Sequence, residues 1–185
     1  MDQTRATALP TGILSESRRL IWAGGFALLT AAGAQITIPQ QPVPFTLQTF
    51  FVLLAGALLG MRTGAMSQAI YLLAGLCGLP VFAGFGFGLA RLIGPTGGYL
   101  LAFPLAAFAV GYLAGERAGF IRYLLAMTAG LLIIFTIGTL QLNLTLYHNL
   151  SAAAAHGFMI FSVWDGVKLA GAAAIAASFR GRLRG

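Results

Sequence analysis

The longest stretches without a charged side chain constrain this chain most. The 42 residues from Leu20 to Met61 carry no charge, and the ranges 63–90, 92–115 and 123–164 are also uncharged. A membrane-spanning helix needs about 20 mostly apolar residues, so these runs have room for six helices. Charged residues make up only 8% of the chain, whereas soluble domains carry about 25%. The apolar excess must therefore face lipid.

The pattern inside these runs favours helices over a membrane barrel. Barrel strands alternate apolar and polar residues over segments of about ten residues, whereas the run at 124–140 reads LLAMTAGLLIIFTIGTL without alternation. We therefore predict an all-α, polytopic membrane protein with six transmembrane helices in the cell membrane. The expected membrane domain is 20–179, between a polar amino-terminal tail at 1–19 and a basic carboxy-terminal tail at 180–185.

The cations indicate which helix ends face the cytoplasm. The net charge is +7, but the basic residues lie at segment boundaries rather than along polar helix faces, which argues against binding of nucleic acid. With both termini cytoplasmic, nine of the ten loop or tail cations lie inside, as the positive-inside rule requires. Arg91 alone lies outside. The nine are Arg5, Arg18, Arg19, Arg62, Arg117, Arg122, Arg180, Arg182 and Arg184.

A cleaved signal peptide is the competing interpretation of the first apolar run. Arg18 and Arg19, the run LIWAGGFALLT and the segment 32–34 imitate the charged, apolar and cleavage regions of such a peptide. The apolar run continues to Ile38, however, and cleavage would remove a helix that the charge distribution requires. We expect a retained first helix from about Leu20 to Ile38.

Proline and glycine mark the connections between helices. Three prolines in the segment 38–45, IPQQPVPF, exclude a helix and predict a stiff external connection. Helix two is expected to end near Gly60, before a cytoplasmic turn at Arg62. The glycine-rich stretch 79–99 is expected to fold over or into the bundle, because non-helical backbone at membrane depth must be covered by protein. The remaining expected elements are a third helix from the cytoplasmic turn to about Gly78, helices at 98–115 and 120–142, an outer segment at 143–157 and a last helix ending near Phe179.

Asp165 and Lys168 carry the strongest indication of function. They lie three residues apart in SVWDGVKLAG and so share one helix face, near the expected outer end of helix six. Each would cost about 2.5 to 3.5 kcal/mol at the bilayer centre, so neither is expected to face lipid. They either bind a ligand or form a mutual ion pair that only fixes the helix. We favour binding, because ionisable groups inside a membrane are functional by default.

Further polar and aromatic residues are expected on the same outer side. They add a second cation, exposed backbone N–H groups of the glycine-rich stretch, amide and hydroxyl groups, and aromatic rings. Such a set inside an apolar shell suits a small amphiphilic anion. The candidates are Thr46, Gln48, Phe82, Phe85, Phe87, Arg91, Tyr99 and Trp164.

The sequence argues against an enzyme and against a channel. A phosphate-binding GxxxxGK[ST] loop is missing, since GPTGGY at 94–99 lacks the lysine, and no GxSG motif supplies an activated serine. His148 and His156 both fall in the outer segment, and Cys77 is the only cysteine, so we expect no cofactor and no metal. A constitutive channel would need a polar stripe along several helices, whereas polar residues here concentrate at the outer ends.

Three tracts resemble one known family. QITIPQQPVPFTLQTFFVLLAGALLG at 35–60, YLLAGLCGLPVFAG at 71–84 and LIGPTGGYLLAF at 92–103 are similar to the BioY family, the biotin-specific S components of energy-coupling factor transporters. The resemblance spans helix one to helix six. Helix six departs from the family's common LPGDLLK, because this chain reads SVWDGVK at 162–168 and keeps the acid and the lysine but not the Pro-Gly.

The resemblance implies a six-helix protein that captures biotin from outside, with a transmembrane coupling protein and a pair of ATPases as its transport partners. Asp165 would accept hydrogen bonds from the ureido N–H groups of biotin, and Lys168 would donate to the ureido carbonyl. Arg91, with backbone N–H groups near Gly84 and Gly88, would hold the carboxylate. The opposite orientation, with Lys168 on the carboxylate, stays open.

Small residues spaced four apart on helix one indicate a close helix contact. Ala23, Ala27 and Ala31 either pack inside the bundle or dock another membrane protein, and the resemblance favours docking to the coupling protein. Association of the chain with itself stays open. The competing functions are a stand-alone permease for another small organic anion or vitamin and an acyl- or lipid-modifying membrane enzyme.

Overall fold

The protein is a bundle of helices, as its composition predicts. The computed structural model describes residues 11–115, 118–157 and 163–179. Its helices are α1 (Thr11–Gln35), α2 (Gln48–Leu76), α3 (Leu89–Ile93), α4 (Gly97–Ala114), α5 (Phe120–Leu142), α6 (Leu150–Gly157) and α7 (Val163–Ser178). Two-residue strands β1 (Thr37–Ile38) and β2 (Phe45–Thr46) pair antiparallel. A 3₁₀ turn, η1 (Ala83–Phe85), and a π-helix, η2 (Asn143–Tyr147), complete the described elements.

Three of the described helices are long and apolar enough to cross a membrane, by length and composition. They are α2, α4, and α5 continued through η2 to Tyr147. The predicted bounds of helix five, 120–142, agree with α5. The first helix differs, because α1 begins at Thr11, inside the expected polar tail, and ends at Gln35 rather than Ile38. Ile38 instead belongs to β1, since the proline-rich segment that follows cannot continue a helix.

Helix α2 consists of two halves that fold back on each other at Gly60. The backbone of Gly60 has φ 81° and ψ 176°, a conformation that glycine adopts without a steric penalty. A Cβ added to Gly64 would lie 2.8 Å from the Cα of Gly56, although residues eight apart in a straight helix are about 12 Å apart. The predicted break near Gly60 is therefore confirmed, and the turn leaves Arg62 exposed.

Glycines also let α4 pack closely against both halves of α2. A Cβ on Gly56 would collide with the carbonyl oxygen of Ala107, and one on Gly111 would collide with the backbone of Gly60 and Met61. Small residues allow this separation between helix backbones inside a membrane. The contact of α4 with the α2 turn also places the carboxy end of α4 beside Gly60.

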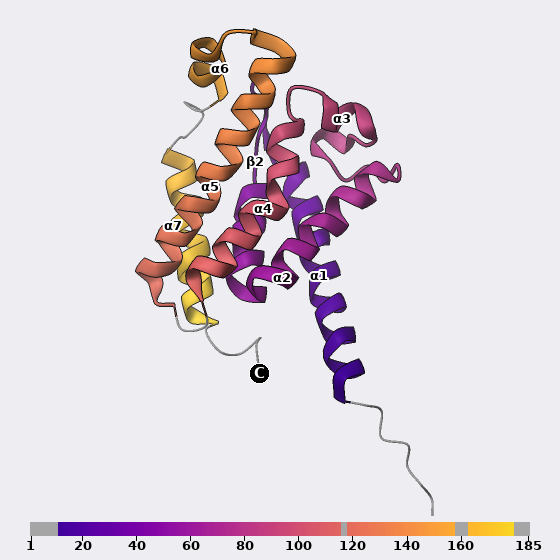
Figure 1. The fold of residues 1–185 in the computed structure, drawn as a ribbon, viewed down its shortest axis with the longest axis vertical. Coiled ribbons are helices and arrows are strands. Elements are labelled where there is room, and N and C mark those ends of the chain that lie inside the picture. Colours follow the sequence, from indigo (N-terminus) through magenta and orange to yellow (C-terminus); the bar gives the residue numbers. More distant parts are fainter. Residues whose placement is uncertain (1–10, 116–117, 158–162, 180–185) are drawn as a thin grey trace, which may run out of the picture.

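The described chain ends and most of the exposed basic residues in the described part of the chain lie at one end of the molecule. In Figure 1 the start of α1 and the end of α7 lie low in the view, whereas α3 and α6 lie toward the top. Arg62 lies at the turn of α2, and the Nε of Arg122 donates to the carbonyl of Leu113 at the end of α4. Arg91, in contrast, lies on α3.

The glycine-rich stretch 79–99 packs on the bundle, as expected. Phe82 is 1% exposed, and its ring lies against Gly75 of α2, where a Cβ would collide with it. Farther along, the side-chain amide of Gln141 donates to the carbonyls of Leu92 (2.7 Å) and Gly94 (2.8 Å). These contacts fix the non-helical backbone at both of its ends, against α2 and against α5.

The alanine row on α1 faces the chain's own bundle. Ala23 has no exposed surface, Ala27 is 7% exposed, and Ala31 is partly buried against the core. Their small side chains let α1 approach neighbouring helices of the same chain. This arrangement agrees with packing inside the bundle, the first of the two alternatives for these alanines. Docking of a partner through these alanines stays a prediction, and it is one that this arrangement does not favour. The outward face of α1 instead carries Leu28 and Ala32.

Candidate functional site

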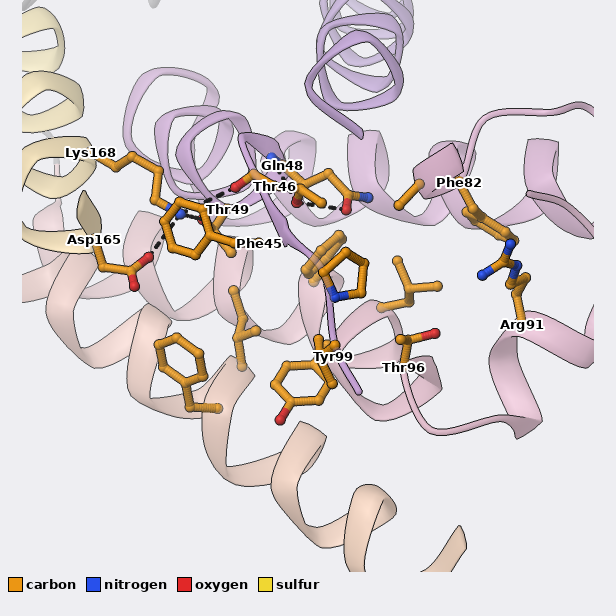
Figure 2. A pocket seen from close by; sticks show the side chains of 17 residues that line it. Phe45, Thr46, Gln48, Thr49, Phe82, Arg91, Thr96, Tyr99, Asp165 and Lys168 are labelled. Carbon is orange, nitrogen blue, oxygen red and sulfur yellow. Dashed lines mark hydrogen bonds and ion pairs between the residues drawn. The ribbon is translucent and has the colours of Figure 1, made fainter. Parts of the chain in front are cut away.

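A pocket lies where β2 and the start of α2 meet α4, α5 and α7 (Figure 2). The segment between α2 and α4 closes another side. Polar groups from distant parts of the chain line it among apolar and aromatic side chains. The lining residues are Val43, Pro44, Phe45, Thr46, Gln48, Thr49, Phe82, Ala83, Arg91, Thr96, Tyr99, Leu100, Phe103, Ile134, Phe135, Asp165 and Lys168.

At one end of the pocket, α7 presents Asp165 and Lys168. The Nζ of Lys168 lies 2.8 Å from Oδ1 of Asp165, and the side chains are 11% and 1% exposed. Burial of one charge without the other would be strongly unfavourable, so each side chain compensates the charge of its partner. The Nζ of Lys168 also donates to Oγ1 of Thr49 (2.8 Å) and to the carbonyl of Thr46 (3.2 Å). It lies 3.9 Å from the ring centre of Phe45, within cation–π range.

Hydrogen bonds continue from Thr46 into the bundle. The hydroxyl of Thr46 donates to Oε1 of Gln48 (2.9 Å), and Nε2 of Gln48 donates to the hydroxyl of Tyr71 (2.6 Å). Tyr71 in turn donates to the carbonyl of Val81 (3.2 Å). Gln48 is 4% exposed, so these partners replace the water that a buried amide lacks. The position of Gln48 is therefore set by both β2 and the second half of α2.

Aromatic side chains form much of the remaining wall. The rings of Tyr71 and Phe103 are stacked with centres 6.3 Å apart, and Phe82 meets Tyr71 edge-on at 5.6 Å. Tyr99 meets Phe135 edge-on at 6.3 Å, and its hydroxyl donates to the carbonyl of Gly157 in α6 (3.1 Å). The hydroxyl groups of both tyrosines are thus bonded to protein. The ring of Tyr99 lines the pocket, whereas Tyr71 packs behind the lining rings of Phe82 and Phe103.

Arg91 lies across the pocket from the Asp165–Lys168 pair, as Figure 2 shows. Its guanidinium passes close to the backbone of Gly86, where an added Cβ would lie 2.6 Å from Nε. A larger residue at 86 would push the arginine away from this position. The pocket therefore has a carboxylate and an ammonium group at one end, a guanidinium at the other, and aromatic and aliphatic side chains between them.

The structure brings most of the predicted site residues together. Thr46, Gln48, Phe82, Arg91, Tyr99, Asp165 and Lys168 all line the pocket. Trp164 does not, because it is 62% exposed on the face of α7 away from Asp165. Gly84 and Gly88 are not among the lining residues either, and Ala83 represents their segment there. Their positive φ angles, 64° and 82°, instead shape the loop that carries Phe82.

Sequence reasoning missed Thr49 and most of the apolar wall. Thr49 lies in the first turn of α2, one residue after the candidate Gln48, so its place in the chain could have indicated it. The wall residues Phe103, Ile134 and Phe135 carry no comparable signal, because they lie within uniformly apolar helices. His148 and His156 are exposed, as expected for the outer segment.

Fold and pocket together define a helical membrane protein whose internal site suits a small molecule with polar groups at both ends. The structure resembles a crystal structure of the S-component for biotin from an ECF-type ABC transporter, with a TM-score of 0.84, 24% identity, and coverage of 94% of this chain and 95% of that one. The model of the BioY family matches residues 3–185, and the chain belongs to that family.

Named relatives agree with this family assignment. The biotin transporter BioY of Thermotoga maritima is 48% identical over 159 residues, which cover 86% of this chain and 94% of the relative. The probable biotin transporter BioY of Pyrococcus horikoshii is 46% identical over 156 residues, which cover 84% and 92%. The similarity thus extends over nearly the whole length of both relatives.

Proposed function

We propose that this protein captures biotin and takes it up across the membrane as the substrate-binding subunit of an energy-coupling factor transporter. One observation carries the proposal: the buried Asp165–Lys168 pair faces Arg91 across a pocket with an apolar wall. Biotin has a matching arrangement, because its ureido ring and its carboxylate lie at opposite ends of an apolar ring and chain. Membership of the family and the names of the relatives support the same ligand.

The ureido ring fits the α7 end of the pocket. It offers two N–H donors to the Asp165 carboxylate and one carbonyl to the Lys168 ammonium, and hydrogen bonds to charged groups are the strong ones. The carboxylate would then reach Arg91, whose guanidinium can form two parallel bonds to it. Tyr99 and Phe103 would enclose the ring and the chain.

Six spans follow if α2 is counted as two segments. α1, the two halves of α2, α4, α5 and α7 would each cross the bilayer once, with both termini in the cytoplasm. The exposed cations at Arg62 and Arg122 lie at the end opposite to the pocket, and the positive-inside rule assigns that end to the cytoplasm. The pocket would thus open toward the outside of the cell membrane.

The chain acts as a transporter subunit rather than an enzyme in this proposal. It would supply the binding site, while a transmembrane coupling protein and separate ATPase subunits would supply the energy for uptake. The GPTGGY segment at 94–99 forms the entry to α4 and contributes Thr96 and Tyr99 to the pocket wall. It therefore serves the ligand pocket and lacks the lysine of a nucleotide site.

Equilibrium binding by the purified protein tests the proposal. Labelled biotin should bind and should be displaced by unlabelled biotin but not by lipoate, thiamine or riboflavin. Biotin amide, which lacks the carboxylate charge, should bind about 10 to 150-fold more weakly than biotin. This factor corresponds to the loss of one charge-assisted hydrogen bond of about 1.5 to 3 kcal/mol. Absence of measurable biotin binding by folded protein would overturn the proposed function.

A further inference from the structure

Gln35, at the last position of α1, lies outside the pocket lining but contacts the loop between α2 and α3. Its Nε2 donates to the carbonyl of Phe82 (3.1 Å) and also approaches the carbonyls of Ala31 (3.4 Å) and Val81 (3.5 Å). Its Oε1 accepts from the backbone N–H of Phe85 (3.0 Å). Both ends of one side-chain amide therefore bind the backbone of a single loop. The partners in this loop are 46 to 50 residues away in sequence.

The loop bound by Gln35 is part of the pocket wall. Phe82 and Ala83 line the pocket, and the ring of Phe82 is 1% exposed against Gly75 and Tyr71. The backbone of this loop is irregular, since Phe85 has a φ of 56°. A non-glycine residue in this region costs about 1 kcal/mol or more and needs surrounding contacts to persist. Gln35 supplies such a contact at the N–H of Phe85 itself.

A second glutamine reaches the same loop from the pocket side. Gln48 donates to the Tyr71 hydroxyl, and Tyr71 donates to the Val81 carbonyl that Gln35 also approaches. Gln48 accepts from Thr46, whose carbonyl accepts from Lys168. A series of hydrogen-bonded residues thus links α1, the loop and α2 to the charged pair on α7.

From these contacts we infer that Gln35 is a positioning residue for the ligand site, which holds the segment Val81–Phe85 against the bundle and so keeps Phe82 in the pocket wall. Gln35 does not line the pocket and acts through the loop. The inference rests on the proposed binding of biotin in this pocket. It also predicts that α1 and the pocket are energetically coupled, because the loop position depends on both glutamines.

Replacement of Gln35 by leucine tests this role with a matched control. Gln35→Leu keeps a similar size but removes both the donor and the acceptor, so biotin should dissociate about tenfold faster, the effect of losing one or two net hydrogen bonds. The association rate should change little, because the pocket groups are untouched. Gln40→Leu changes an exposed glutamine of the neighbouring connection and should leave both rates unchanged.

Gln35→Glu provides a readout that a merely structural role would not give. The new carboxylate can still accept from the Phe85 N–H, but its other oxygen faces the carbonyl oxygens of Ala31, Val81 and Phe82 without a donor. A protonated carboxyl can donate to one of them. The affinity of this variant, relative to wild-type protein at the same pH, should therefore recover as the pH is lowered. Among the described residues, Tyr71 contacts this loop at Val81 and Arg91 contacts it at Gly86, and the wild-type reference corrects for any titration of these two side chains.

Hydrogen exchange separates failure of this inference from failure of the proposed function. In Gln35→Leu the amides of 81–88 should exchange at least about tenfold faster than in wild-type protein without any ligand present, while amides of α5 keep their rates. If wild-type protein does not bind biotin, the proposed function fails, and the exchange result still decides the role of Gln35. Unchanged exchange and dissociation in Gln35→Leu would overturn the inference. Loss of folding in both Gln35 variants would also overturn it, because Gln35 would then support the whole fold.

Discussion

At the residue scale, Lys168 shows why its charge can stay inside an apolar bundle. Its ammonium has a carboxylate, a hydroxyl and a carbonyl as acceptors, and an aromatic ring beside it. Three of these four partners come from 45–49, more than a hundred residues away in sequence. An ammonium with its three donors directed to acceptors meets the requirement for a buried charge. Lys168 can therefore form an ion pair with Asp165 and line the pocket at the same time.

Substitution of the two charged residues tests which of them recognises the ligand. Asp165→Asn should weaken biotin binding about 10 to 150-fold, because a neutral amide accepts less strongly and leaves Lys168 without its counter-ion. Lys168→Arg should weaken binding less, because it retains a cation near the same acceptors. Trp164→Phe is the control, since Trp164 is exposed and lies outside the pocket. Isothermal titration of the three folded variants measures the effect, and wild-type affinity in Asp165→Asn would leave the ion pair with a structural role only.

At the element scale, the sequence predicts features that depend on neighbouring residues better than contacts between residues far apart in the chain. The bounds of α5, the break at Gly60 and the i, i+3 pair on α7 depend on neighbouring residues, and the sequence predicts all of them. The contact of Thr49 with Lys168 joins residues 119 apart, and the clamp by Gln35 joins residues up to 50 apart. Such pairings depend on how the helices pack, which local periodicity does not encode. The sequence likewise does not show that Trp164 lies outside the pocket, because a one-residue step from Asp165 turns a side chain by about 100° around the helix.

The close contact of α2 with α4 gives a prediction at this scale. Gly111→Ala should lower the stability of the folded bundle by about 1 to 3 kcal/mol, because the new Cβ would collide with the backbone of Gly60 and Met61, which cannot rotate away. Gly25→Ala is the control. It lies in α1 with no other atom within 4 Å of the added Cβ, and alanine favours a helix by up to about 1 kcal/mol. Thermal unfolding in detergent should show a lower midpoint for Gly111→Ala alone, and equal midpoints would contradict the tight contact.

At the scale of the whole molecule, charge and polarity divide the protein along its long direction. Arg62 and Arg122 are exposed at the end that holds the α2 turn, while the pocket lies toward the end that holds α3. Among the described residues, the charged side chains that are largely buried are Asp165 and Lys168, and both line the pocket. In the proposed orientation, this separation would place the basic end against anionic lipid headgroups at the cytoplasmic surface and leave the other end to receive the ligand.

Cysteine labelling from outside the cell tests this orientation. In a Cys77→Ala background, Gln41→Cys and His148→Cys should react with a membrane-impermeant maleimide, because both positions are exposed near the pocket end. Arg62→Cys should react only after the membrane is permeabilised. The background protein without cysteine sets the baseline. Labelling of Arg62→Cys in intact cells would contradict a cytoplasmic position for the α2 turn.

Association with a coupling protein depends on which face of α1 is free in the membrane. Ala27 is buried in the chain's own bundle, whereas Ala32 is exposed on the outward face with Leu28. If the partner docks on this outward face, Ala32→Trp should abolish co-purification with the coupling protein and leave biotin binding by the isolated subunit intact. Ala27→Trp should instead lower stability and biotin binding together, because it overpacks an internal contact at a cost of about 1 to 3 kcal/mol or more. The reverse result, in which Ala27→Trp keeps full biotin affinity but loses its partner, would mean that α1 turns its alanine row outward when the transporter assembles.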